Sequence, residues 1–163
     1  MYDARKIGNL FLSLYEAHGI EVKRELIMGM VYVAHARSLG WRNKPLISGR
    51  IEAWHYGPVI PSIYYGLART TVTNEQDGTK KTFFPKMRET GGDVEAPVLR
   101  LVNEVFNEYK GFSVEDFRKI LGEKNEAVRE AMMKKGALMD ETDIRCSLPR
   151  IESSSPSARL PLG

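Results

Sequence analysis

Residues 50–65 constrain the fold of this chain more than any other segment. They read Arg-Ile-Glu-Ala-Trp-His-Tyr-Gly-Pro-Val-Ile-Pro-Ser-Ile-Tyr-Tyr, which places four aromatic residues, two prolines and a glycine within sixteen positions. Such a density is typical of neither a linker nor a single amphipathic helix. The pattern predicts a short extended run over 51–54, a turn set by Gly57-Pro58, and a helix over 61–69 that begins with Pro61 in its first turn.

The aromatic side chains of this segment have two interpretations. In the first, Trp54, Tyr56 and Val59 anchor the turn in the hydrophobic core, since large rings bury much apolar area. In the second, the rings form a rigid exposed platform for a protein partner, because Tyr, Trp and Arg dominate interface hot spots. The core interpretation is favoured for Trp54.

Helical spacing separates the inward from the outward residues after Pro61. Ile63 and Leu67 are four positions apart and share a face, which leaves the neighbouring tyrosines turned outward. We therefore expect partner contacts from the following residues: His55, Tyr56, Tyr64, Tyr65 and Arg69.

The remaining pattern predicts a mainly α fold, a compact domain of about six helices with a small β-hairpin or short sheet. Apolar residues recur at helical spacing in most segments. Gly19 and Gly40 stand where helices commonly end in a left-handed residue. Ser113 and Asp116 have the spacing of a capping box. The predicted helices cover residues 3–18, 22–39, 61–69, 97–109, 113–121 and 123–135, with a last helical turn at 140–143.

The stretch from Thr70 to Phe84 changes character and predicts a β-hairpin. β-Branched and aromatic residues flank a turn-rich tip at 74–78 that contains Asp-Gly. Residues 85–96 are expected to form an exposed loop. The predicted organisation is one domain over 1–150, followed by a flexible tail over 151–163 that is rich in serine and proline.

Size and composition indicate an ordinary globular protein. The 163 residues suffice for one domain with a real core, and 42% hydrophobic and 28% charged residues are usual for such proteins. No segment reaches the roughly 18 continuous apolar residues of a membrane span, and the first residues lack the apolar run of a secretory leader. With Cys146 as its single cysteine, the chain is expected to be cytoplasmic and free of internal disulfides.

Histidine and cysteine positions argue against a metal or catalytic site. His18, His35, His55 and Cys146 show neither the i, i+4 nor the Cys-x-x-Cys spacing of zinc ligands. Nucleophile elbows, phosphate-binding loops and dinucleotide-binding glycine patterns are missing from the sequence. We predict no enzyme activity, no cofactor and no metal. Glu52 is the most interesting acid, and a structural hydrogen bond or salt bridge is favoured for it over general-base catalysis.

The charge of the chain leaves a second class of function open. The net charge is +3 and the isoelectric point is near 9.0, and the predicted helix pair over 113–135 is compatible with a nucleic-acid-binding regulator. Lysine and arginine nevertheless alternate with glutamate, whereas DNA-binding domains concentrate basic residues on one face. Nucleic acid is therefore the less favoured partner.

The order of residues in the central part of the chain resembles the Panacea domain of SocA-like and GepA-like proteins. The resemblance rests on the core Glu-Ala-Trp-x-Tyr-Gly-Pro-Val-x-Pro-x-x-Tyr at 52–64, is strong over 26–67 and extends weakly over 3–148. Weaker agreement is found at 112–117 and 139–144. Within this motif the signature residues that are expected to fix the local structure are Glu52, Trp54, Gly57, Pro58 and Pro61.

The resemblance implies a compact, mainly helical domain that acts as an antitoxin. Members of this family neutralise diverse protein toxins by direct contact, and at least one type delivers its toxin to the ClpXP protease. Two departures affect which contacts carry over: Met28-Gly29 stand where many relatives have Gln-Lys, and 120–126 lack a Leu-Thr-His and Pro-Trp pattern. A phage or mobile-element accessory protein that binds a host factor is the remaining alternative.

Overall fold

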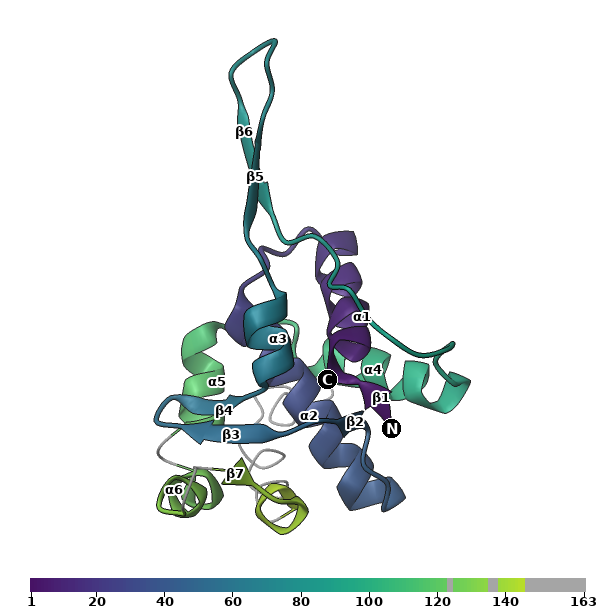
Figure 1. The fold of residues 1–163 in the computed structure, drawn as a ribbon, viewed down its shortest axis with the longest axis vertical. Helices are drawn as coiled ribbons and strands as arrows, with labels where there is room; N and C mark the ends of the chain where they lie inside the picture. The colour runs from purple at the N-terminus through teal and green to yellow at the C-terminus, as the bar shows by residue number, and fades with distance from the viewer. Residues whose placement is uncertain (123–124, 135–137, 146–163) are drawn as a thin grey trace, which may run out of the picture.

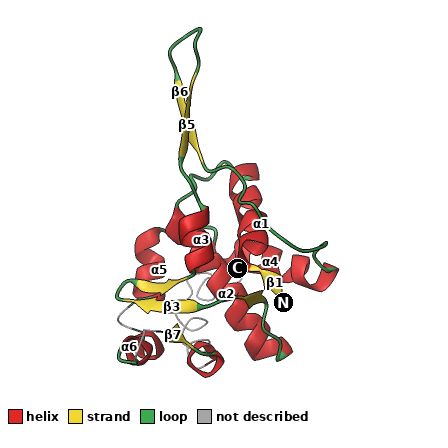
Figure 2. Ribbon diagram, in the orientation of Figure 1, coloured by secondary structure: helices red, strands yellow, loops and turns green. Residues whose placement is uncertain are grey.

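The computed structural model describes residues 1–122, 125–134 and 138–145, and these residues form a mainly α fold with minor β structure, as predicted (Figure 2). A further helical segment covers residues 141–145. The predicted tail over 151–163 and Cys146 lie outside the described residues. The six labelled helices are α1 (Ala4–Ala17), α2 (Arg24–Arg42), α3 (Pro61–Gly66), α4 (Ala96–Tyr109), α5 (Val114–Leu121) and α6 (Glu126–Met132).

Seven short strands form three small sheets in the described part of the chain. In the first sheet β1 pairs with β2 in parallel, and in the second β3 lies between β4 and β7 with antiparallel pairing. The third sheet is the hairpin of β5 and β6. The strands are β1 (Tyr2–Asp3), β2 (Ile47–Ser48), β3 (Ile51–Trp54), β4 (Gly57–Val59), β5 (Thr70–Thr73), β6 (Lys80–Phe83) and β7 (Leu138–Met139).

Helix α2 is the centre of the core. Its residues from Leu26 to Leu39 are all buried, and α1, α3, α4 and α5 each contact it. Its near-continuous apolar sequence is typical of a helix covered on every side. Strand β4 of the small sheet of β3, β4 and β7 contacts α2 and α5, and α6 packs against β3 and β7 (Figure 1).

Two polar side chains inside the core fix α2 to its neighbours. The His35 Nδ1 atom accepts hydrogen bonds from the backbone N–H groups of Leu46 and Ile47, at 3.1 and 3.3 Å. The buried Arg37 guanidinium forms an ion pair with Glu108 of α4. His35 thus holds the chain that leads into β2, and Arg37 joins α2 to α4.

Several predicted helix bounds are wrong, and α6, predicted over 123–135, covers only Glu126–Met132. Helix α2 continues through Gly40 to Arg42, and Asn43 is the left-handed cap with a φ of 52°, because asparagine tolerates this region better than other residues with a Cβ. Helix α3 ends at Gly66 rather than at 69, since Leu67 is already extended and its carbonyl accepts a hydrogen bond from Arg24 at 2.9 Å. The left-handed Gly19 and the capping box at Ser113 are confirmed.

The turn predicted at Gly57-Pro58 is also misplaced. Trp54 pairs directly with Gly57, so His55 and Tyr56 form the turn, and Gly57 and Pro58 belong to β4. Gly57 has a φ of 141°, which disfavours any residue with a Cβ. Pro58 lies on an edge strand, where a missing N–H group is tolerated.

Candidate functional site

Five aromatic side chains of the central segment form a continuous series of ring contacts, here called the aromatic ladder. His55 contacts Tyr56, Tyr56 contacts Trp54, Trp54 contacts Tyr64, and Tyr64 contacts Tyr65, with centroid distances of 4.9, 5.7, 5.4 and 5.1 Å. Three of these contacts are T-shaped and one is tilted, which are favourable arrangements for aromatic pairs. The hairpin of β3 and β4 supplies three rings, and α3 supplies two.

The ladder is buried at its centre and exposed at its ends. Trp54, Tyr56 and Tyr64 are partly buried and pack against the core. His55 is exposed, and Tyr65 is 78% exposed. The structure therefore brings four of the five predicted contact residues together through Trp54.

Arg69 is the predicted contact residue that the ladder does not include. It is exposed just before β5 and lies 4.0 Å from the carboxylate of Glu21, which is also exposed. An exposed ion pair of this kind contributes little to stability. Arg69 is thus placed at the base of the β5–β6 hairpin, not beside the tyrosines.

A carboxylate holds the ladder's central ring in place. The Glu52 Oε2 atom accepts a hydrogen bond from Trp54 Nε1 at 2.9 Å, and Glu52 Oε1 lies 3.0 Å from Arg50. Glu52 and Trp54 are two positions apart on β3, so their side chains lie on the same face of the strand. The Glu52 carboxylate thus makes both a hydrogen bond and a salt bridge, the two kinds of contact that the sequence analysis favoured for it.

Two arginines that the sequence analysis missed lie over ladder rings. The Arg24 guanidinium is 4.8 Å from the centre of the Tyr64 ring, and that of Arg118 is 5.6 Å from the Tyr56 ring. Such cation–π contacts stabilise the rings in fixed orientations. The sequence did contain a sign that Arg118 is special. Arg118 is a charged residue within the apolar stripe that Phe117 and Leu121 form on α5.

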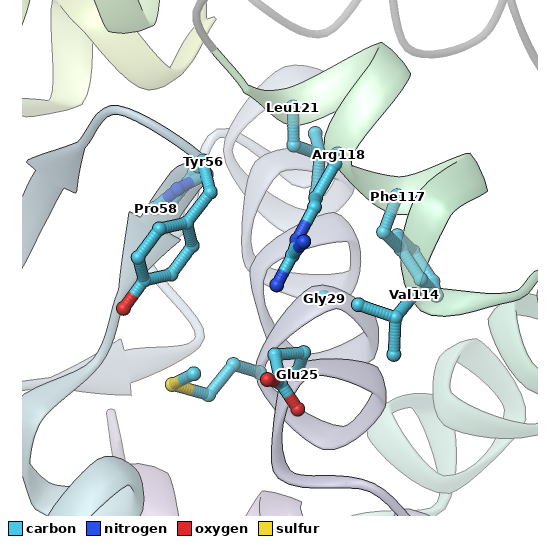
Figure 3. A pocket seen from close by; sticks show the side chains of 10 residues that line it. Glu25, Gly29, Tyr56, Pro58, Val114, Phe117, Arg118 and Leu121 are labelled. Carbon is cyan, nitrogen blue, oxygen red and sulfur yellow. The ribbon is translucent and has the colours of Figure 1, made fainter.

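A small apolar hollow, here called the socket, opens beside the ladder between α2, β4 and α5 (Figure 3). The Arg118 side chain points into the space between Tyr56 and Glu25, and Phe117 and Val114 close the side toward α5 (Figure 3). Burial raises the pKa of Tyr56, and Tyr64 and Glu25 add to this rise, so its hydroxyl stays protonated and can donate. The socket is lined by Glu25, Met28, Gly29, Tyr56, Gly57, Pro58, Val114, Phe117, Arg118 and Leu121.

The size of the socket limits what it can take. Its cavity volume is about 30 Å³, whereas small-molecule sites usually measure about 300–1,000 Å³. It has room for part of one side chain and not for a metabolite. In the described part of the chain, no group of three or more His, Cys, Asp or Glu side chains is placed to hold a metal ion.

A family model described as antitoxin SocA-like, Panacea domain, matches residues 27–126. The chain belongs to this family. The matched region of the Panacea domain contains the whole aromatic ladder, the β5–β6 hairpin and α5.

One curated relative and the solved structures complete the comparison. Antitoxin SocA of Caulobacter vibrioides (strain NA1000 / CB15N) is 39% identical over 62 residues, which cover 38% of this chain and 33% of that protein. The match thus spans a third of the relative's own length. No solved structure is significantly similar to this Panacea domain.

Gly29 of the Panacea domain leads to a testable prediction, because it lets α5 approach α2 closely. A Cβ atom at this position would lie 2.8–2.9 Å from three ring atoms of Phe117. We expect Gly29→Ala to lower the free energy of unfolding by about 1–2 kcal/mol, since overpacking outweighs the gain of about 1 kcal/mol in helix propensity. Chemical denaturation measures this change.

Gly8→Ala is the matched control for this prediction. Gly8 also lies inside a helix, but a Cβ atom added there would meet the flexible end of the Met87 side chain, at 2.8 Å. Gly8→Ala should leave stability unchanged or raise it. Equal stability changes in the two variants would contradict the proposed close approach of Phe117 to Gly29.

Proposed function

We propose that this protein is an antitoxin that neutralises a toxic partner protein by binding it through the aromatic ladder and the socket. The observation that carries the proposal is a set of connected, partly exposed rings in a member of the SocA-like family. Rigid Tyr, Trp and Arg side chains provide most of the binding energy in protein interfaces. The protein acts by binding in the cytoplasm and has no catalytic step of its own.

The geometry favours binding of a protein over binding of a small ligand. The exposed Tyr65 and His55 offer contact area at little entropic cost, because the neighbouring rings and arginines already fix the ladder. The socket beside Tyr56 accepts part of one apolar side chain and places the Arg118 guanidinium next to it. A partner that inserts one side chain there is held by shape and by charge.

Co-expression with the product of the adjacent gene tests the proposal. We expect that product to arrest growth when it is induced alone, and this protein to restore growth. An adjacent product that is harmless alone, or growth that stays arrested when both are made, contradicts the antitoxin function.

The same experiment separates two mechanisms of neutralisation. If the surface of the toxin is occluded, its amount stays constant and the two proteins purify together. If the protein is an adaptor for a ClpXP-type protease, the amount of toxin falls, and deletion of the protease restores both the toxin and its effect on growth.

A further inference from the structure

The base of the hairpin of β5 and β6 borders two adjoining cavities, here called the cleft. One side is the connection that leads from the end of α1 to α2, and the other is β6 with the residues that follow it (Figure 1). The cavity volumes are about 700 and 250 Å³, so the cleft can take whole side chains, unlike the socket. The two cavities share the following lining residues: Glu16, Ile20, Glu21, Phe83 and Phe84.

The floor of the cleft is apolar. Phe84 is buried, Ile20 is half-buried, and Phe83 is 37% exposed. Val22 extends the floor in the smaller cavity, and Pro85 extends it in the larger one. An exposed apolar surface with a charged rim is typical of a protein-interaction site.

The charged residues of the cleft are separated by sign between its two sides. Glu16 and Glu21 belong to the α1–α2 side, whereas Arg69, Lys81 and Lys86 belong to the hairpin side. Within the described chain these five are all the charged residues that line the two cavities, and all of them are exposed. The cleft therefore has an acidic wall and a basic wall, with the apolar floor between them.

The charges of both walls are open to a partner. Arg69 and Glu21 lie 4.0 Å apart with side chains that are 62% and 72% exposed, and such a pair contributes little to stability. Among the described residues, the side chains of Glu16, Lys81 and Lys86 form no ion pair. A charge that is buried without a partner is costly. A protein that covers the cleft must therefore supply basic groups to one wall and acidic groups to the other.

An α-helix can meet this requirement, and a β-strand cannot. A helix presents an apolar stripe with a separate row of polar residues on each flank, as coiled coils do at their e and g positions. A strand has only two faces, so a strand that lays its apolar face on the floor turns its charges away from both walls. A second copy of the chain would bring the same hollow surface and leave the floor uncovered.

We propose that the cleft binds an amphipathic helix of a partner protein, whose apolar stripe covers Phe83, whose basic flank faces the acidic wall and whose acidic flank faces the basic wall. An amphipathic helix in a hydrophobic groove is a recurring mode of protein recognition. Arg69, which the sequence analysis proposed as a partner contact away from the aromatic residues, then has a role in the basic wall. Identification of this partner as the toxin rests on the proposed function, but the preference of the cleft for such a helix does not.

Three synthetic helical peptides serve as probes. All have leucine at i, i+3, i+4 and i+7. The bipolar peptide carries lysine on one flank and glutamate on the other, and the two uniform peptides carry only glutamate or only lysine. Titration of the isotope-labelled protein gives the Kd of each peptide and the amides whose chemical shifts change. We expect the bipolar peptide to bind about tenfold more tightly than either uniform peptide, with shifts at Ile20 and Phe83, and to bind more weakly as salt is added.

Two matched double variants test the assignment of the walls. Glu16→Lys with Glu21→Lys makes both walls basic, so the glutamate peptide should become the tightest ligand. Lys81→Glu with Lys86→Glu should give the opposite preference, for the lysine peptide. All four positions are exposed, so the melting temperature should stay nearly unchanged. Lys119→Glu is the control, because it changes an exposed lysine of α5 that lines neither cavity, and it should bind the peptides as the wild type does.

Several outcomes would overturn the inference. These are no binding of the bipolar peptide, equal or tighter binding of a uniform peptide to the wild type, the same order of affinities in both double variants, or dimerisation without peptide. The result is separable from the antitoxin function. If both double variants still neutralise the toxin, the cleft is not the toxin's binding site while the proposed function stands. If the adjacent product is not toxic, the peptide titrations still decide the cleft.

Discussion

Replacing Arg37 by alanine is expected to lower the free energy of unfolding by about 3–5 kcal/mol, which is the usual effect of removing one partner from a buried ion pair. Arg37 is 2% exposed, forms an ion pair with Glu108, and lies over the rings of Trp41 and Tyr109, at 5.0 and 5.4 Å. Its loss leaves the Glu108 carboxylate without this partner in a partly buried place. Chemical denaturation measures the change.

Two further variants show whether the effect comes from the pair. Arg100→Ala removes an exposed arginine from α4 and should change stability by no more than about 0.5 kcal/mol. The double variant Arg37→Met with Glu108→Leu should recover most of the lost stability, since apolar residues often replace a buried pair without loss. A double variant as unstable as Arg37→Ala would contradict this explanation.

Acid is expected to destabilise the fold through His35. Burial lowers the pKa of His35 from 6.5 to about 4, and its Nδ1 atom can accept the two backbone hydrogen bonds only while it is unprotonated. Between these two pH values the unfolded chain binds a proton that the folded protein does not. The free energy of unfolding therefore falls as the pH decreases from about 6.5 to 4, by up to roughly 3 kcal/mol.

The variant His35→Asn isolates this contribution. Its side-chain oxygen can accept hydrogen bonds near the position of Nδ1 but does not titrate, so stability between pH 6.5 and 4 should become nearly independent of pH. Asp3, with a pKa of about 2, loses its contribution below this window, and Glu89, whose pKa its hydrogen bonds to Asn9 and Lys6 lower from 4.5, contributes only at the acid end of the window, so the wild type and the variant are compared above about pH 5. An unchanged pH dependence in His35→Asn would show that another group is responsible.

The sequence predicted the helices, the β5–β6 hairpin and the inward face of α3 because these features depend on local patterns. Ile63 and Leu67 are buried and Tyr65 is exposed, as their helical spacing indicates. The ends of α2 and α3 were misplaced since tertiary contacts decided them: Arg24 holds Leu67, and the left-handed residue is Asn43 instead of Gly40. Strands of two residues such as β1 and β7 have no periodicity to detect.

The candidate site was only partly predictable from sequence for a similar reason. The ladder residues lie within one segment, and four of them were proposed as partner contacts, whereas Trp54 was assigned to the core and its role as their link depends on the fold. The socket joins α2, β4 and α5, so Arg24, Gly29 and Arg118 become part of the site only through tertiary packing. Arg69 is close to the ladder in sequence but lies at the base of the β5–β6 hairpin.

The most direct test of the central claim is the affinity of the purified protein for its toxic partner after loss of one ladder ring. Tyr65→Ala removes an exposed ring, and Met133→Ala removes an apolar side chain that is also highly exposed but lies after α6. We expect Tyr65→Ala to raise the Kd by about 30-fold, equivalent to about 2 kcal/mol, with the melting temperature unchanged. Met133→Ala should bind as the wild type does, and a Tyr65→Ala protein with wild-type affinity would contradict the assignment of the aromatic ladder as the binding surface.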